Sequence, residues 1–461
     1  MDIRNDISVS DLERLLANFW EISAQKIRLI RKEYDPSQGS PVFTEAGKYT
    51  TRGWTEWTQG FQFGSELIQF DATDQQEFLE WGRDATLNKM APHITHIGVH
   101  DHGFNNVSTY GALRRLSYEG RINAGRWEQH FYDLALKSTG AVQASRWTET
   151  SDGGGFIYSF NGPHSLFVDT VRTLRALALS YSLGHQLFGE QDKQISLLDR
   201  LIQHARSTAE FSVYYGEGRD AYDVRGRTTH EAVFNVKNGV FRCPNSQQGY
   251  SPFSTWTRGL AWAMCGFPEQ LEYIKVLEDE ELEPFGGREE IESMMLKAAT
   301  ATCDFYIENS SQDGIPYWDT GAPELHNLGD YTSSPADPYN DFEPVDSSAA
   351  AIGAQGLLRL GHYLQSSGEQ EKGEKYWQAG LTVAETLLDE PYLSTDQNHQ
   401  GLLLHSVYHR PNGWDYIPEG KKIPCGESSM WGDYHMRELV LYLHRMANDE
   451  SYYTFFNGIE K

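Results

Sequence analysis

Twelve stretches with apolar residues at helical spacing constrain how this chain of 461 residues can fold. In the clearest stretch, Val171, Leu174, Ala178 and Tyr181 share one face, and Gly184 follows as a typical helix stop. The predicted helices cover residues 11–33, 57–70, 74–93, 104–117, 121–139, 164–186, 191–213, 256–276, 287–308, 346–366, 369–388 and 431–447. Because short turns join many neighbours, they should form antiparallel hairpins. Six hairpins predict an all-α fold, and composition does not choose between a closed toroid and an open solenoid.

Three long connections interrupt this helical pattern, at residues 214–253, 309–345 and 389–430. Long loops in a compact domain usually carry function. Short strands are expected in the connections, at residues 155–160, 231–242, 314–320 and 401–409. Since no linker or low-complexity tract divides the chain, we expect a single domain over residues 1–461.

The charge of the chain excludes several kinds of partner. The formal net charge is −26, and a field of that sign repels nucleic acids and anionic membranes. An acidic ligand would therefore need a local basic pocket. No apolar run approaches the roughly 18 residues of a membrane span, and the four cysteines are far apart. We expect free thiols and a cytoplasmic protein, or a periplasmic one if a leader was removed.

The stretch from Ser254 to Phe267, STWTRGLAWAMCGF, combines unusual side chains at the start of an apolar helix. Ser254 and Thr255 can cap the helix. Trp256, Arg258 and Trp262 follow within two turns, and a guanidinium group with two indole faces suits an acidic, ring-shaped ligand. The alternative is a core helix with two packing tryptophans and a surface salt bridge.

Two aspartates are candidates for acid–base chemistry. Asp101 lies in HDHGF, beside His100, at the start of a helix, where it could also be only an N-cap. Asp169 lies inside an apolar run, where burial should raise its pKa to suit a general acid, unless Arg172 or a loop neutralises it. Two carboxylates in unlike environments are typical of glycoside hydrolysis.

Other candidate residues are less specific. His230 in TTHEAVF could donate a hydrogen bond, although a lone histidine is more often structural. Trp54 and Trp57 are core residues by default and could stack on a sugar ring. The histidines at positions 93, 96, 100 and 102 lack convincing ligand spacing, so no metal and no cofactor are predicted.

Several segments, in order from about residue 50 to 447, resemble glycoside hydrolase family 88, the unsaturated glucuronyl hydrolases. They are WTQGF, HDHGF, QASRW, the Asp169 helix start, the His230 and Gln248 positions, WTRGLAW, DGIPYWD, DSSAAAI and MWGDY. The resemblance implies an (α/α)6 barrel with short strands in its long loops. It also implies catalytic roles for Asp169 and Asp101. Substrate-binding roles are expected for Trp57, His100, Trp147, His230, Gln248, Trp256, Arg258 and Trp262.

The activity that the resemblance implies is hydrolysis of lyase-generated oligosaccharides that carry 4,5-unsaturated glucuronic acid at the non-reducing end. Asp169 would protonate C4, and water would then add at C5. The nearest alternative is an inverting glycosidase acting on a saturated uronide, with Asp169 as acid and Asp101 as base. A sugar-binding toroid without catalysis is a further alternative, which would not need a poised Asp169.

An insert at residues 411–429 carries Lys421 and Lys422. It could fold over the mouth of the barrel and present a lysine to an acidic oligosaccharide, the one partner we expect. The alternative is a solvated loop whose lysines offset Glu419 and Glu427. The sequence leaves open whether the protein is a monomer or a homodimer.

Overall fold

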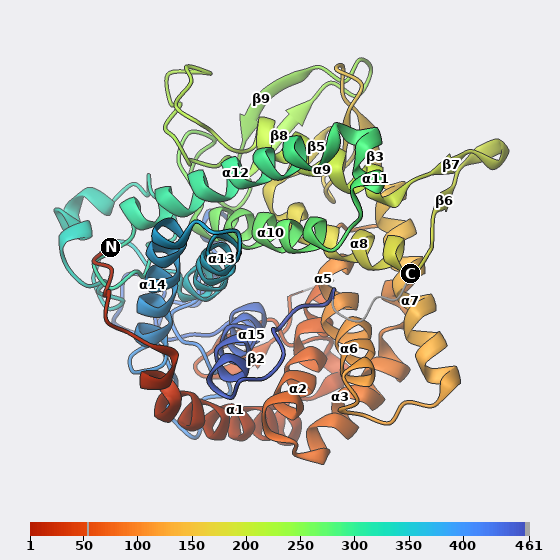
Figure 1. The fold of residues 1–461 in the computed structure, drawn as a ribbon. Coiled ribbons are helices and arrows are strands. Elements are labelled where there is room, and N and C mark those ends of the chain that lie inside the picture. The colour runs from red at the N-terminus through yellow and green to blue at the C-terminus, as the bar shows by residue number, and fades with distance from the viewer. Residues whose placement is uncertain (53–54, 457–461) are drawn as a thin grey trace.

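The structure, a computed structural model, describes residues 1–52 and 55–456, so that Trp54 lies outside the described residues. The chain is mostly helical (Figure 1). Its longer helices are α1 (Glu13–Glu33), α2 (Gln59–Thr73), α3 (Gln76–Lys89), α7 (Arg126–Ser145), α8 (Leu174–Ser182), α9 (Leu197–Phe211), α10 (Thr257–Lys275), α12 (Gly287–Asn309), α13 (Ser347–Ser366), α14 (Gln370–Leu387) and α15 (Met430–Ala447). Shorter helical segments are α4 (Ala91–Thr95), α5 (His102–Asn106), the π turn η4 (Val107–Gly111), α6 (Ala112–Tyr118), the 3-10 segment η5 (Val168–Thr173) and α11 (Asp279–Leu282). Each predicted stretch contains at least one of these helices, although residues 165–167 and 194–195, which were predicted to be helical, form short strands.

The helices are arranged in two layers (Figure 1). In the inner layer, α2 contacts α5 and η4, α5 contacts η5, η5 contacts α10, α10 contacts α13, α13 contacts α15, and α15 contacts α2. The outer helices α1, α3, α7, α9, α12 and α14 each pack on an inner neighbour. The inner helices pack closely because small residues lie between them: a Cβ on Gly356 of α13 would stand 2.4 Å from the Met264 carbonyl oxygen of α10.

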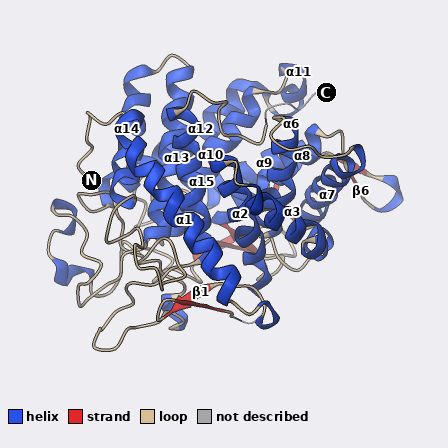
Figure 2. Ribbon diagram, turned by 90° about the horizontal axis from the view of Figure 1, so that it is seen from below, coloured by secondary structure: helices blue, strands red, loops and turns tan. Residues whose placement is uncertain are grey.

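Short strands lie in the connections between helices. They are β1 (Phe43–Glu45), β2 (Lys48–Thr50), β3 (Trp147–Glu149), β4 (Gly155–Ile157), β5 (Ser165–Phe167), β6 (Leu187–Phe188), β7 (Gln194–Ile195), β8 (Glu231–Phe234) and β9 (Phe241–Asn245). Strands β5, β8 and β9 form an antiparallel sheet in the order β5-β8-β9. The segments predicted as strands at 314–320 and 401–409 form only isolated bridges, such as Tyr317 with Val345 and Leu404 with Ser428. Figure 2 shows many of the loops gathered on the side of the molecule where β1 lies.

The structure shows how the first helix and α10 are capped, and at α10 the cap differs from the prediction. The capping box at the N-terminus uses Ser8 and Asp11, because a 3-10 turn (Val9–Leu12) precedes α1. Helix α10 has Trp256 at its N-cap without a side-chain cap, while the Thr255 hydroxyl bonds to the backbone of Thr228.

Two predictions about the whole chain can also be compared with the structure. Cys243, Cys265, Cys303 and Cys425 are free thiols, as predicted. Among the described residues, no helix combines the length and apolarity that a membrane span requires.

Candidate active site

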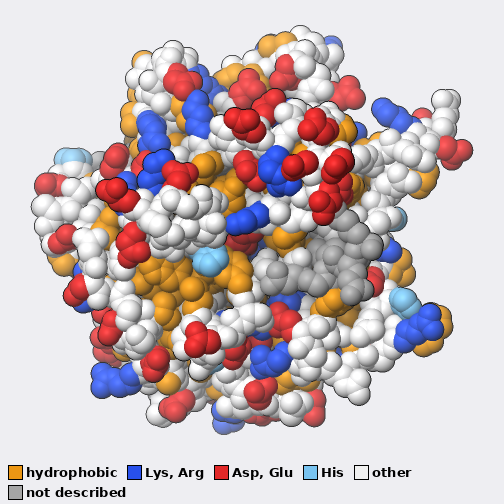
Figure 3. Space-filling model, viewed as in Figure 1, with side chains coloured by type: hydrophobic (Ala, Val, Ile, Leu, Met, Phe, Trp, Pro, Cys, Tyr) orange, Lys and Arg blue, Asp and Glu red, His pale blue; other side chains and the backbone are white. Residues whose placement is uncertain are grey.

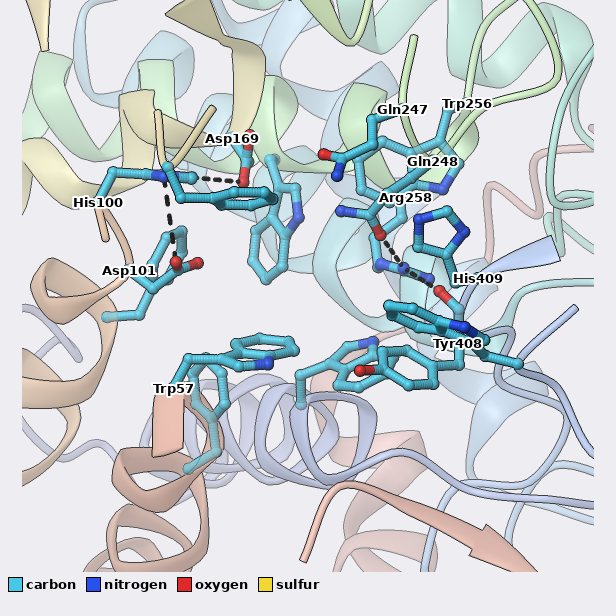
Figure 4. Close-up of a pocket in the computed structure, with 16 residues that line it drawn as sticks. Trp57, His100, Asp101, Asp169, Gln247, Gln248, Trp256, Arg258, Tyr408 and His409 are labelled. Atoms are coloured by element: carbon cyan, nitrogen blue, oxygen red, sulfur yellow. Dashed lines mark hydrogen bonds and ion pairs between the residues drawn. The ribbon is translucent and has the colours of Figure 1, made fainter. Parts of the chain in front are cut away.

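A pocket of about 280 Å³ opens between the inner helices and two of the long loops. Aromatic rings form most of its wall, and two aspartates lie at one end (Figure 4). The lining residues are Trp57, Phe61, His100, Asp101, Phe104, Phe160, Asp169, Gln247, Gln248, Trp256, Arg258, Trp262, Tyr408, His409, Trp414 and Trp431. Most of the candidates from the sequence therefore meet in one cavity.

The two aspartates flank the imidazole ring of His100. His100 Nε2 lies 3.1 Å from Asp169 Oδ2, and His100 Nδ1 lies 4.0 Å from Asp101 Oδ2. Asp101 is the N-cap residue of α5, but its side chain makes no capping hydrogen bond. The interpretation that Asp101 is only an N-cap is therefore wrong, and its carboxylate is directed to the pocket.

Specific contacts bring together the segments that carry His100, Asp101 and Asp169. Asp169 lies in η5, directly after β5, and the Val168 N–H donates to the His230 carbonyl oxygen. The Thr173 hydroxyl donates to the carbonyl oxygen of His100 at 2.8 Å. A Cβ on Gly103 would lie 2.4 Å from Thr173 Cγ2, so the glycine of HDHGF permits this close approach of α5 to η5.

The direction of the pKa shift of Asp169 is opposite to the prediction. Burial alone would raise the pKa of Asp169, but attraction to His100 and the hydrogen bond from it outweigh burial and lower that pKa. Burial, together with repulsion by Asp169, raises the pKa of Asp101. Burial would lower the pKa of His100, yet Asp101 and Asp169 raise it. The expectation that burial raises the pKa of Asp169 is therefore wrong, because His100 stabilises the ionised carboxylate more than burial disfavours it.

Three buried polar atoms around this pair lack hydrogen-bond partners among the described residues: Asp169 Oδ1, His100 Nδ1 and His230 Nε2. Buried polar atoms are rarely left unsatisfied, because the lost hydration costs about 1–3 kcal/mol for each group. This concentration of unpartnered atoms indicates a site prepared for a polar ligand.

Arg172 does not neutralise Asp169. Its guanidinium group pairs with Glu269 at 3.0 Å and with Glu438 at 2.6 Å, on α10 and α15. The alternative interpretation of Asp169 as a structural partner of Arg172 is therefore wrong.

Arg258 lines the pocket, but its terminal nitrogens already have protein partners. Nη1 donates to Asp346 Oδ2 at 2.8 Å and to the Val407 carbonyl oxygen at 2.5 Å. Nη2 donates to Gln248 Oε1 at 2.9 Å and to the Tyr408 carbonyl oxygen at 2.9 Å. In this structure Arg258 therefore positions Gln248 and the backbone after Val407, and it bonds to the Gln248 amide oxygen rather than to the amide nitrogen, while its predicted contact with the substrate stays a prediction.

His230 lies behind the pocket wall. Its Nδ1 accepts hydrogen bonds from the backbone N–H groups of Gln247 and Gln248, at 3.0 and 3.2 Å. Because Nδ1 accepts, the proton of the neutral ring is on Nε2. Burial lowers the pKa of His230 to about 4, so the ring is neutral near pH 7. Its direct contribution in this structure is to hold the Gln247–Gln248 turn.

The predicted tryptophans divide into two groups. Trp57, Trp256 and Trp262 line the pocket, and Trp57 stacks on Trp431 with ring centres 5.3 Å apart. Trp147 is not among the lining residues. The centre of its ring lies 3.8 Å from the Arg200 guanidinium carbon, and the ring also packs closely on Gly155. The prediction that Trp147 forms part of the sugar-binding wall is therefore corrected.

Trp262 is only 5% exposed and packs on Phe104 and His435. Truncating such a residue to alanine costs about 3–5 kcal/mol. We therefore expect Trp262→Ala to lower the melting temperature, and the partly exposed Trp57 is a better probe of binding.

Lys421 and Lys422 do not reach the pocket. Lys422 is 70% exposed and pairs with Asp341 at 3.0 Å, while Lys421 Nζ lies 5.2 Å from the centre of the Tyr339 ring. Neither lysine lines the cavity, so the structure does not support the prediction that the insert presents a lysine to the substrate; the insert instead contributes Trp414 to the pocket. On the face shown in Figure 3, basic side chains are interspersed among acidic ones.

Several residues of the wall had no predicted role. Trp431 lies in the MWGDY segment, which carried the resemblance but received no role. Tyr408, His409 and Trp414 come from the long loop 389–430, where loop length was the available signal. Phe160 stacks on His100 with ring centres 5.9 Å apart, and no sequence pattern singled it out.

The described residues contain one group of side chains compact enough to hold a metal ion. The ligand atoms of His100, Asp101 and Asp169 lie within 4.8 Å of one another. A cation there would have to replace the His100–Asp169 hydrogen bond. His93 and His96 both hydrogen-bond to the ring of His102 instead, at 3.3 and 2.7 Å.

Two acidic side chains at one end of an aromatic pocket, within a helical fold, are the arrangement of a glycoside hydrolase. No protein-family model matches the chain. The unsaturated glucuronyl hydrolase of Bacillus sp. (strain GL1) is 23% identical over 409 residues, which cover 87% of this chain and 89% of that protein. The unsaturated glucuronyl hydrolase of Formosa agariphila is 28% identical over 241 residues, covering 52% of this chain and 46% of the relative.

Solved structures show the same fold. The crystal structure of unsaturated glucuronyl hydrolase from Bacillus sp. GL1 has a TM-score of 0.69 at 20% identity and covers 93% of this chain and 97% of that one. An unsaturated glucuronyl hydrolase specific for heparin has a TM-score of 0.71 at 18% identity, covering 95% and 98%. These matches confirm the resemblance to the unsaturated glucuronyl hydrolases of glycoside hydrolase family 88.

Proposed function

We propose that this protein is a hydrolase that releases 4,5-unsaturated glucuronic acid from the non-reducing end of lyase-generated oligosaccharides. The observation that carries the proposal is the Asp101–His100–Asp169 group at the end of an aromatic pocket, with Asp169 Oδ1 unpartnered. The named activity of the relatives supports it.

We also propose that the fold is an (α/α)6 barrel formed by one domain over residues 1–461. The support is the succession of inner-helix contacts from α2 to α15 and back to α2, with an outer helix packed on each inner neighbour. In such a barrel the loops at one end of the inner helices converge on a common cavity, which agrees with a pocket lined from α5, η5, α10 and α15.

The reaction that fits this chemistry is hydration of an enol ether. The substrate's C4=C5 bond is conjugated to its carboxylate, so a proton added at C4 leaves positive character at C5 and the ring oxygen. Water then adds at C5, and the hemiketal opens and expels the leaving group. No nucleophile is needed at the anomeric carbon.

Asp169 must carry a proton to protonate C4, although its resting form is ionised. An anionic, water-excluding substrate reverses this balance, because desolvation and a nearby negative charge both raise the pKa of a carboxyl group. The proton on His100 Nε2 then moves to Asp169 along the 3.1 Å hydrogen bond. After protonating C4, the Asp169 carboxylate accepts a proton from the attacking water. The two residues share one proton, as coupled groups do.

The remaining wall would position the sugar. Trp57 offers a ring face, Gln248 offers its free amide nitrogen, and Asp101 offers a carboxyl oxygen to sugar hydroxyl groups. Arg258 acts by holding Gln248. Aromatic faces beside a few polar groups are typical of sites that bind sugar rings.

The test of the function is loss of ultraviolet absorbance by the C4=C5 bond of a lyase-generated disaccharide. The absorbance should fall with time and the leaving sugar should appear in equal amount. The saturated analogue should remain intact. Hydrolysis of the saturated uronide with retention of the unsaturated one would instead favour an inverting glycosidase.

His100→Gln should move the alkaline limb of the pH profile of kcat/KM to lower pH. In the wild type, the proton is held by His100, whose pKa Asp101 and Asp169 raise, so activity falls as pH rises through that pKa. Glutamine keeps a hydrogen-bond donor but stores no proton, and carboxyl groups ordinarily titrate roughly 2–3 units below imidazole. Other charged or titratable groups near this site are Arg146, His204 and His230.

The control for this prediction is His204→Gln. His204 is buried, accepts a hydrogen bond from the Ile157 N–H, and has a pKa lowered by burial to about 3. Its replacement should leave the limb in place. A limb that moves to higher pH in His100→Gln would mean that His100 only suppresses the protonation of Asp169 and does not supply its proton.

A further inference from the structure

The end of the pocket away from the aspartates is formed by one loop. Tyr408, His409 and Trp414 all line the cavity. In Figure 4, Tyr408 and His409 lie across the pocket from His100, Asp101 and Asp169. The loop therefore faces whatever part of a ligand projects away from the acid–base group.

The chemistry of the substrate specifies that part. In a six-membered sugar ring, C1 lies opposite C4. If Asp169 delivers a proton to C4, the bond from C1 to the leaving group points to the far end of the pocket. The leaving sugar would then meet Tyr408, His409 and Trp414.

The loop is built to hold these rings in place. The Asp415 carboxylate accepts hydrogen bonds from the backbone N–H groups of Tyr408 and His409, the latter at 3.0 Å. The Asn412 N–H donates to His409 Nδ1 at 3.3 Å. The Trp414 ring centre lies 4.9 Å from that of His409 and 5.3 Å from that of Tyr408. Trp414 remains 45% exposed, so part of its ring is accessible to a ligand.

Free positive charge is scarce among the side chains that line this end; Arg410, which follows His409 in the loop, does not line the cavity. Among the lining residues within the described part of the chain, Arg258 is the one side chain with a permanent positive charge, and Asp346, Gln248 and two carbonyl oxygens occupy its terminal nitrogens. Burial lowers the pKa of His409 to about 4, so its ring is neutral near pH 7. Lys421 and Lys422 lie outside the cavity.

From these observations we infer that Tyr408, His409 and Trp414 form a leaving-group subsite that accepts an uncharged sugar and disfavours a sulfated one. The inference rests on the proposed function and adds the class of leaving group to it. A sugar face stacks on an aromatic ring with little loss of hydration. A sulfate group would lose water against aromatic walls without a free cation to replace it.

The experiment compares three substrates of 4,5-unsaturated glucuronic acid: its methyl glycoside, its disaccharide with an unsulfated N-acetylhexosamine, and the same disaccharide with one sulfate on the hexosamine. We expect the unsulfated disaccharide to exceed both others in kcat/KM by about tenfold or more. Trp414→Ala should lower the ratio of kcat/KM for the unsulfated disaccharide over the methyl glycoside by about tenfold. Trp414→Phe, which keeps a ring, should retain most of that ratio.

The matched control is Trp127→Ala on α7, because Trp127 is 87% exposed and does not line the pocket. This variant should keep the wild-type ratio, and melting temperatures should verify that every variant is folded. Equal turnover of the sulfated and unsulfated disaccharides would overturn the preference for an uncharged sugar. An unchanged ratio in Trp414→Ala would overturn the subsite alone. Turnover of none of the three substrates would overturn the proposed function and, with it, the subsite.

Discussion

Asp169→Asn is expected to lower kcat by roughly 10²–10⁴-fold, the usual contribution of general acid–base catalysis. We expect the upper end, because the same carboxyl group protonates C4 and then accepts the proton of the attacking water. Asparagine has the shape of aspartate and can still bond to His100, but it carries no transferable proton. The measurement is the steady-state loss of ultraviolet absorbance on a disaccharide that the wild type hydrolyses.

Glu66→Gln provides the matched control for this variant. Glu66 is also a buried carboxyl group whose pKa burial raises, but it pairs with Arg31 at 2.7 Å and does not line the pocket. The activity of the Glu66→Gln variant should stay within a few fold of that of the wild type. Near wild-type turnover by a folded Asp169→Asn protein would refute the proposed mechanism.

Arg258→Met is expected to lower the free energy of unfolding by about 3–5 kcal/mol, the cost of removing one partner from a buried ion pair. Asp346 is fully buried, and its Oδ2 accepts from Arg258 at 2.8 Å. Without the guanidinium group, this carboxylate loses its cationic partner. Activity should fall as well, because Gln248 loses the donor that orients its amide group. Denaturant unfolding at neutral pH measures the first effect.

The double variant Arg258→Met with Asp346→Asn should recover part of the lost stability, because it removes the unpaired buried charge. Lys372→Met is the control for an exposed pair, since Lys372 contacts Glu369 at the surface, and its loss should cost at most about 1 kcal/mol. If Arg258→Met costs no more stability than Lys372→Met, the buried Arg258–Asp346 pair does not stabilise the fold as proposed.

Most of the helices could be predicted from the local spacing of apolar residues. The apolar spacing that places Val171, Leu174 and Ala178 on one face is set by the geometry of a helix, so it can be read without knowing what the helix packs on. The same holds for the other helices, although their exact ends moved with the caps. The HDHGF motif was also informative, because its Gly103 permits the close packing that brings Asp101 and His100 next to Asp169.

The tertiary structure decided the properties that depend on neighbours distant in sequence. Burial alone predicted a raised pKa for Asp169, but His100, 69 residues earlier in the chain, lowers it. Arg258 has the residue type of an anion binder, yet Asp346, 88 residues away, and the carbonyl oxygens of Val407 and Tyr408 occupy its terminal nitrogens. The helices and the motifs that they carry depend largely on interactions between residues close in sequence. The sequence by itself therefore determined them. Protonation states and the availability of a charged side chain depend on the electrostatic field and hydrogen bonds of the folded chain, which only the tertiary structure specifies.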